Sequence, residues 1–213
     1  MRARALVVAA GVALVVLSLA GCAPEPASPS PTASGTASAS PSSVPSPLSS
    51  ASEPSPSGTA DADNIALPTE CEQIYSPQML ASLTAEAPPL NDPGVTMLST
   101  QNAELLEILH SGLPTIRCSW GAPSEFGLAT NVSIVDNAQS AAVATALRDA
   151  GFGCEEHAGG TICRTDQTVI SQDDTQVRLG ETHFLRGNGW VSTAWINFAP
   201  TGYTEDIVAT LWG

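Results

Sequence analysis

Three histidines are the side chains of this sequence best suited to acid–base chemistry, and His183 has the most suggestive neighbours. If residues 177–186 form a β-strand, Glu181 and His183 lie on one face of it, and Ser192 lies on the strand that follows. A serine, a histidine and a carboxylate are the groups of a hydrolytic triad. Neighbouring strands bring such residues together routinely, so we expect ordinary sheet pairing here and keep a hydrolase acting through His183 as an alternative.

Two other clusters have the residue types of metal ligands. Glu107 and His110 have the E-x-x-H spacing of a carboxylate-bridged metal site, but that site needs a second copy, which the chain lacks. Cys154, His157 and Cys163 are spaced as three zinc ligands, yet a fourth ligand is not obvious. The signatures of nucleotide-binding, esterase and metalloprotease sites are absent from the sequence. We expect no metal and no cofactor, and the sequence leaves enzymatic activity uncertain, leaning against it.

The residue with the clearest chemistry is Cys22. Arg2 and Arg4 precede a nearly continuous apolar run over residues 5–20, and small residues follow it. A positive start, a short apolar run and a small-residue cleavage site are typical of a secretory signal. The run is shorter than the roughly 20 residues that a spanning helix needs.

The four residues Leu19, Ala20, Gly21 and Cys22 resemble the lipobox of bacterial lipoproteins. In that family a diacylglycerol group is attached to the cysteine thiol, and a peptidase then cuts before the cysteine. The resemblance implies a signal peptide over residues 1–21 and palmitate-type acyl chains on Cys22. Two chains give stable attachment to a membrane, so we expect the protein on the outer face of the cytoplasmic membrane.

Residues 22–60 are predicted to be a stalk without secondary structure. From Ala23 to Ala60 nearly every residue is Ser, Pro, Ala, Thr or Gly. Such a tract has too little apolar surface to offset the entropy of ordering. We expect a disordered spacer of about 100 Å when fully extended at about 3.1 Å per residue, followed by a folded domain over residues 61–213.

The charge of the chain excludes several partners. The sequence holds 7 Lys and Arg against 21 Asp and Glu, for a net charge of −14. Loss of residues 1–21 removes two further positive charges. Such a surface repels phosphate groups, so we expect no nucleic acid and no electrostatic docking to anionic lipids.

Four cysteines remain for the domain: Cys71, Cys118, Cys154 and Cys163. An exported protein folds in an oxidising setting, where disulfides are the default. Three connectivities are possible. We favour Cys154 with Cys163, because the intervening glycines can turn the chain back, and by exclusion Cys71 with Cys118.

Helix signals occur at both ends of the domain. Ser76-Pro77 is a capping residue followed by proline, which predicts a short helix that ends before Pro88. Ser99 or Thr100 is expected to cap a second helix that stops at Gly112.

Two more helices follow later in the chain. Asp136 or Asn137 is expected to cap a third helix over residues 138–150. Thr204 is expected to cap the last one, with two acidic residues in its first turn.

Alternating β-formers predict the strands. Residues 114–121 and 127–135 are expected to pair, and two short strands are expected around the turn at His157–Gly160. Asn188-Gly189 then separates residues 177–186 from residues 190–198. This dipeptide supplies the two positive φ angles of a type I′ hairpin. The order of elements predicts an α+β domain, with an antiparallel sheet of about four to six strands, three or four helices and two disulfides.

A binding surface is expected near two tryptophans. Trp190 and Trp195 face opposite sides of their strand if alternation holds, so one of them could lie on an open sheet face or in a groove. We include His183, on the neighbouring strand, in this candidate surface.

The whole layout resembles the small secreted lipoproteins of uncharacterised function that are common in high-GC Gram-positive bacteria. The shared features are the lipobox, the Ser/Pro-rich stalk, a Cys near the first helix, a Cys in the first strand and a later Cys pair. More faintly, it is similar to the two-disulfide extracellular sensor domains of actinobacterial Ser/Thr kinases. The resemblance implies a role in the cell envelope and no reaction. We expect a non-enzymatic binding or interaction module for an envelope protein or an apolar small molecule; the alternatives are an envelope hydrolase and a purely structural component.

Overall fold

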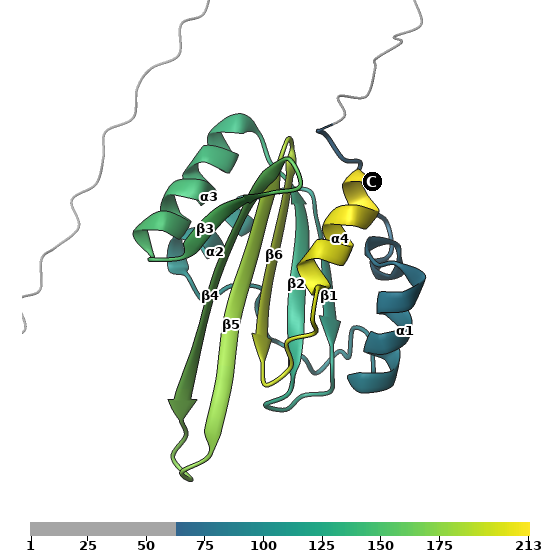
Figure 1. Cartoon of the computed structure of the whole chain (residues 1–213), viewed down its shortest axis with the longest axis vertical. Coiled ribbons are helices and arrows are strands. Elements are labelled where there is room, and N and C mark those ends of the chain that lie inside the picture. The colour runs from purple at the N-terminus through teal and green to yellow at the C-terminus, as the bar shows by residue number, and fades with distance from the viewer. Residues whose placement is uncertain (1–62) are drawn as a thin grey trace, which may run out of the picture. The chain divides into compact units, whose positions relative to one another are not determined.

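The computed structural model describes residues 63–213 as an α+β domain built on a six-stranded antiparallel sheet (Figure 1). Cys22, the signal peptide and the stalk expected at residues 22–60 lie outside the described residues. The sheet has the order β1-β2-β6-β5-β4-β3. Its strands are β1 (Thr115–Trp120), β2 (Gly127–Ile134), β3 (Gly153–His157), β4 (Gly160–Ile170), β5 (Gln176–Arg186) and β6 (Gly189–Ile196). The helices are η1 (Cys71–Ile74), α1 (Pro77–Glu86), α2 (Ala103–Leu109), α3 (Asn137–Asp149) and α4 (Tyr203–Trp212). The predicted fold class is confirmed.

Helices pack on both faces of the sheet (Figure 1). Leu83 of α1 and Ile207 of α4 share one apolar cluster with Phe184 of β5. Leu147 of α3 packs in a second cluster with Leu185, the next residue of β5. Successive strand residues point to opposite faces, so the sheet has an α1/α4 face and an α2/α3 face. Each of these large side chains contributes about 1.5–3 kcal/mol by its burial.

The predicted start of α3 is confirmed, and two other predicted helix starts are wrong. Asp136 caps α3 through the backbone N–H of Gln139. The cap of α2 is Asn102, because Ser99 and Thr100 are buried in contacts with the sheet. Helix α4 begins after Gly202, which has a φ of 72°, so Thr204 lies inside the first turn.

The predicted hairpin of β5 and β6 is confirmed, but its turn lies one residue earlier than expected. Arg186 pairs with Gly189, so the two loop residues are Gly187 and Asn188. Gly187 has a φ of 54° and Asn188 has no positive φ, a combination that matches a type II′ turn. The Asn188 side chain instead bonds both backbone groups of Ile65.

Strand β4 is longer than the short strand we expected. It has 11 residues, and β3 pairs with only its first part, as far as Arg164. Beyond that point β4 pairs with β5 alone, through Ile170. The β4–β5 hairpin therefore extends past the end of β3, as the long green strands of Figure 1 show.

Both favoured disulfides are present. Cys71 is bonded to Cys118, which joins η1 to β1. Cys154 is bonded to Cys163, its direct partner in the β3–β4 register. The first disulfide closes a loop of 47 residues and the second a loop of 9. Loop-closure entropy predicts about 4 and about 3 kcal/mol of stabilisation, respectively.

Candidate binding groove

A segment without regular structure, residues 94–102, crosses the α2/α3 face of the sheet, and we call it the strap. Arg117 of β1 holds its first part, because the guanidinium Nη2 donates to the backbone carbonyls of Val95 at 3.2 Å and Met97 at 2.6 Å. Further along, the hydroxyls of Ser99 and Ser192 lie 2.7 Å apart. The strap is thus tied to β1 and β6 before it enters α2.

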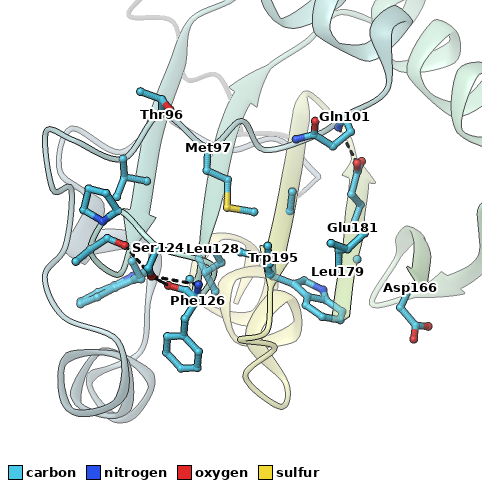
Figure 2. A pocket seen from close by; sticks show the side chains of 18 of the residues that line it. Thr96, Met97, Gln101, Ser124, Phe126, Leu128, Asp166, Leu179, Glu181 and Trp195 are labelled. Atoms are coloured by element: carbon cyan, nitrogen blue, oxygen red, sulfur yellow. Dashed lines mark hydrogen bonds between the residues drawn. The ribbon is translucent and has the colours of Figure 1, made fainter. Parts of the chain in front are cut away.

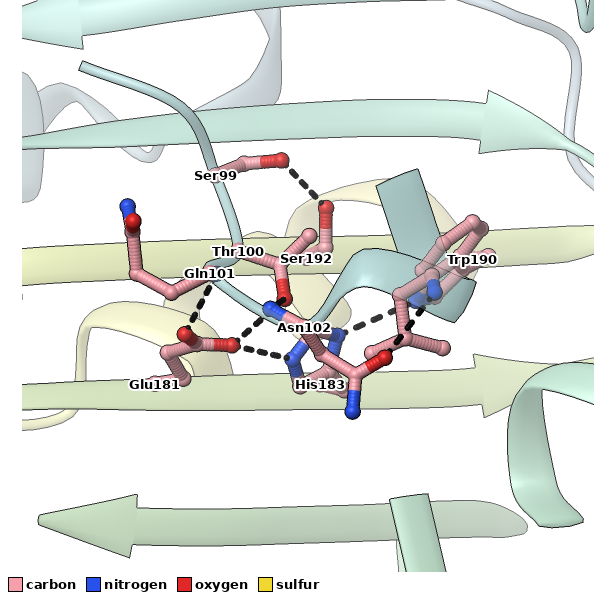
Figure 3. A network of polar contacts seen from close by, with 9 residues as sticks. Ser99, Thr100, Gln101, Asn102, Glu181, His183, Trp190 and Ser192 are labelled. Atoms are coloured by element: carbon pink, nitrogen blue, oxygen red, sulfur yellow. Dashed lines mark hydrogen bonds and ion pairs between the residues drawn. The ribbon is translucent and has the colours of Figure 1, made fainter. Parts of the chain in front are cut away.

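A buried acid–histidine network ties the strap to β5 (Figure 3). The Glu181 carboxylate accepts hydrogen bonds from the Thr100 hydroxyl at 2.6 Å and the Gln101 backbone N–H at 2.7 Å. His183 Nε2 lies 3.2 Å from the same carboxylate, and Trp190 Nε1 donates to His183 Nδ1 at 3.3 Å. Since Nδ1 accepts a hydrogen bond from Trp190, Nε2 carries the ring proton and donates to Glu181. Every donor in this series of hydrogen bonds therefore has an acceptor.

The environment lowers the pKa of both titratable groups. Burial lowers the pKa of His183 and outweighs the opposing effect of Glu181, which leaves the imidazole neutral. Burial alone would raise the pKa of Glu181. The hydrogen bonds from His183, Thr100 and Gln101 outweigh it and lower the pKa, so the carboxylate is ionised.

The hypothetical triad is only partly assembled. Ser192 pairs directly with His183 across β5 and β6, and Glu181 is on the same face, as the spacing predicted. However, the Ser192 hydroxyl is bonded to Ser99, and both His183 nitrogens are already bonded to Trp190 and Glu181. His183 and Ser192 are fully buried. The arrangement holds the strap and presents no hydroxyl to a substrate.

A groove of about 580 Å³ lies beside the strap, on the half of the sheet that α2 and α3 leave open (Figure 2). The two helices pack over the hairpin end of this face, near Leu185 and Trp190. The opposite end, with Leu179 and Ile196, lines the groove. Met97 of the strap points into it. The volume is within the range of small-molecule sites, about 300–1,000 Å³.

Small residues contribute to the floor of the groove, and two of them, Gly127 and Ala194, face it. Gly127, Gly180 and Ala194, from three neighbouring strands, all line it. A Cβ at Gly180 would collide with the Trp195 indole and the Thr165 carbonyl. The indole of Trp195 therefore lies against the bare backbone of β5 on the α1/α4 face, and no larger residue fits at Gly180. Trp195 also lines a smaller hollow on the α1/α4 face.

The structure separates the three residues of the expected binding surface. Trp195 lines the groove, whereas Trp190 and His183 are both 0% exposed and form no part of any surface. Trp190 and Trp195 do face opposite sides of β6, because they belong to different apolar clusters, so the Trp195 indole lies on the α1/α4 face, opposite the groove. Sequence reasoning missed Met97 and Phe126, which lie outside regular elements. The only signal was apolar residues among turn-forming ones at 93–98 and 122–126.

The other candidate residues are not assembled into a site. Glu107 is exposed on α2, and His110 is the exposed C-cap residue that follows the helix. Cys154 and Cys163, the hypothetical zinc ligands, are joined in a disulfide. Within residues 63–213 there is no group of three His, Cys, Asp or Glu side chains arranged to hold a metal ion.

Comparisons with protein-family models, curated proteins and solved structures gave no match for this chain. The described helices of residues 63–213 include none with the length and apolar character needed to span a membrane.

Proposed function

We propose that this protein is a lipid-anchored lipoprotein of the cell envelope whose domain binds an apolar molecule without catalysing a reaction. The acyl chains on Cys22 would hold it to the outer face of the cytoplasmic membrane, and the stalk would carry the domain away from the lipid surface. The observation that carries the binding role is the open groove of about 580 Å³ beside the strap.

The chemistry of the lining supports a binding role. Met97, Phe126, Leu179, Ala194 and Ile196 give it a largely apolar surface. A few polar groups lie among them, which is the usual composition of a small-molecule site. The three ties of the strap to β1, β5 and β6 hold this wall in place before a ligand arrives, which lowers the entropic cost of binding.

Two features support the proposed location outside the cytoplasm. The lipobox resemblance ends at Cys22, directly before the Ser/Pro-rich tract. The two disulfides, Cys71–Cys118 and Cys154–Cys163, suit an oxidising compartment outside the cytoplasm.

The envelope hydrolase is the second candidate, because Glu181 and His183 are in contact. Against it, a general base must reach the proton that it abstracts. His183 is buried, and its two nitrogens are bonded to Glu181 and Trp190.

The groove is tested by a neutral fluorescent probe, N-phenyl-1-naphthylamine, titrated into the mature chain carrying Cys22→Ser. This substitution removes acyl chains that would compete with the probe. Met97→Glu places a charge in the groove and is expected to weaken probe binding about tenfold or more, which corresponds to about 1.4 kcal/mol. Leu98→Glu is the matched control, because the adjacent Leu98 is exposed and lies outside the lining. Equal affinity in the two variants would refute the groove as the site.

The anchor is tested by intact mass spectrometry of the protein from its own membrane, with and without reduction. We expect a mass for cleavage before Cys22 plus acyl chains, and a gain of four hydrogens on reduction of the two disulfides. An unacylated mass would overturn the proposed lipid anchor and membrane location.

A further inference from the structure

The two ends of the groove differ in chemistry (Figure 2). Met97 and Phe126 lie at the end over β1 and β2. Glu181 of β5 lines the other end, whereas the side chain of Asp166, which pairs with Gly180, lies on the opposite α1/α4 face beside Arg178. One carboxylate, that of Glu181, thus faces the groove at this end, and no Arg, Lys or His side chain is among the lining residues. A ligand that fills the whole groove therefore contacts apolar side chains at one end and a negative charge at the other.

We propose that the groove selects an elongated amphiphile with an apolar body and a cationic head, such as an alkyl or aryl ammonium. The body lies against Met97 and Phe126, and the head reaches Glu181. From β1 across β2 and β6 to β5 is three strand spacings, or about 14 Å, so the ligand has a chain of that length. This inference rests on the proposed binding function and names the class of ligand.

Glu181 has room for one more hydrogen bond. Its Oε2 accepts from Thr100 and His183, whereas Oε1 accepts only from the Gln101 backbone. An ionised carboxylate has about four acceptor positions. The side chain is 11% exposed, and it lines the groove. A ligand N–H at this point gains a charge-assisted bond without displacing an existing donor.

The two arginines near the groove are engaged with other groups. Arg117 donates to the carbonyls of Val95 and Met97. Arg178 lies 5.6 Å from the centre of the Trp195 ring, and its Nη2 is 3.9 Å from Asp166. Neither arginine is part of the lining. A ligand with an anionic head would place its charge beside Glu181 with no lining cation to compensate.

The test compares three ligands with the same dodecyl tail, below their micelle concentrations: dodecyltrimethylammonium, dodecyl maltoside and dodecyl sulfate. Each displaces N-phenyl-1-naphthylamine from the mature chain carrying Cys22→Ser, at about 0.15 M salt to screen distant charges. We expect the ammonium to bind at least about tenfold more tightly than the sulfate, a difference of 1.4 kcal/mol.

Two lysine variants separate the acidic end from the overall charge of the protein. Gln101→Lys puts a cation at the acidic end and keeps the backbone bond to Glu181. Gln78→Lys makes the same charge change on the exposed surface of α1, outside the groove. We expect Gln101→Lys to reduce the ammonium-to-sulfate preference at least about threefold, and Gln78→Lys to leave it unchanged, because a distant exposed charge is screened.

Each outcome has a distinct meaning. Equal affinities for the three ligands, or an equal effect of the two lysine variants, would overturn the proposed head-group selectivity and leave apolar binding intact. Failure of the neutral probe to bind at all would overturn the proposed function itself. Loss of preference in Gln101→Lys alone supports the assignment of the cationic head to the end of the groove at Glu181.

Discussion

Replacement of Glu181 by Gln tests whether the buried network holds the strap on the sheet. The carboxylate accepts bonds from Thr100, Gln101 and His183, and it offers no donor in return. Gln keeps one oxygen, but its NH₂ group then faces donors. The Thr100 hydroxyl can rotate, whereas the His183 ring cannot change tautomer without opposing the N–H of Trp190.

The energetic cost of Glu181→Gln follows from the fact that all of its partners are donors. One buried donor left without an acceptor costs about 1–3 kcal/mol, and loss of charge assistance in the other bonds adds about 1 kcal/mol. We therefore expect Glu181→Gln to lower the free energy of unfolding by about 2–4 kcal/mol. Typical domains have a total of only about 5–15 kcal/mol.

Urea unfolding at neutral pH, with the disulfides intact and followed by tryptophan fluorescence, measures this change. Glu156→Gln is the control, because Glu156 is exposed on β3 and its replacement should change the free energy by less than about 0.5 kcal/mol. If the two variants unfold at the same urea concentration, the network does not stabilise the domain and the reasoning above is wrong.

Three further predictions concern the buried groups and the disulfides. The pKa values of His183 and Glu181 are lower in the folded protein than the ordinary 6.5 and 4.5. The unfolded chain therefore binds protons first, so stability should be full above pH 6.5 and fall as the pH drops below 6.5 and again below 4.5, as urea midpoints across this range will show. Burial raises the pKa of Tyr75 to about 12 and that of Tyr203 well above its usual 10, and these are the only two tyrosines of the chain. Absorbance at 295 nm should therefore show almost no tyrosinate at pH 10.5 in the folded protein, and about three quarters of the full tyrosinate signal after unfolding. Removal of the Cys71–Cys118 disulfide by paired serine substitutions should cost about 4 kcal/mol against about 3 for the other pair, and an inverted order in urea unfolding would contradict the loop-closure argument.

Local rules predicted the elements because the chemistry that fixes them is local. Asp136 caps α3 through a residue three positions on, so its bond partner is visible in the sequence. Cys154 and Cys163 flank a short turn, and pairing of β3 with β4 places them opposite each other. The Gly187 turn shows the limit of such rules. The Asn-Gly dipeptide predicted a hairpin correctly, but the contact of Asn188 with Ile65, 123 residues away, accompanies a different turn type.

The groove could not be predicted because its wall is set by distant contacts. Ser99 and Thr100 looked like helix caps, since hydroxyls at those positions normally serve that role. In the structure they bond Ser192 and Glu181, which are 93 and 81 residues away. No periodicity marks such a segment, so Met97 was not recognised as a wall residue. Trp195 could be placed only as one of two alternatives, because alternation fixes the face of a strand and not what covers it.

The state of Glu181 favours the proposed binding role over a catalytic one. A general acid or base must gain and lose a proton during each turnover, and its pKa is usually near the working pH. Here the hydrogen bonds to Glu181 lower its pKa, and protonation would weaken the bonds that hold Thr100 and Gln101 on the sheet. A proton cycle at this residue would therefore loosen the wall of the groove at each turnover. A carboxylate that stays ionised serves better as a fixed negative charge, which is the property that a cationic ligand requires.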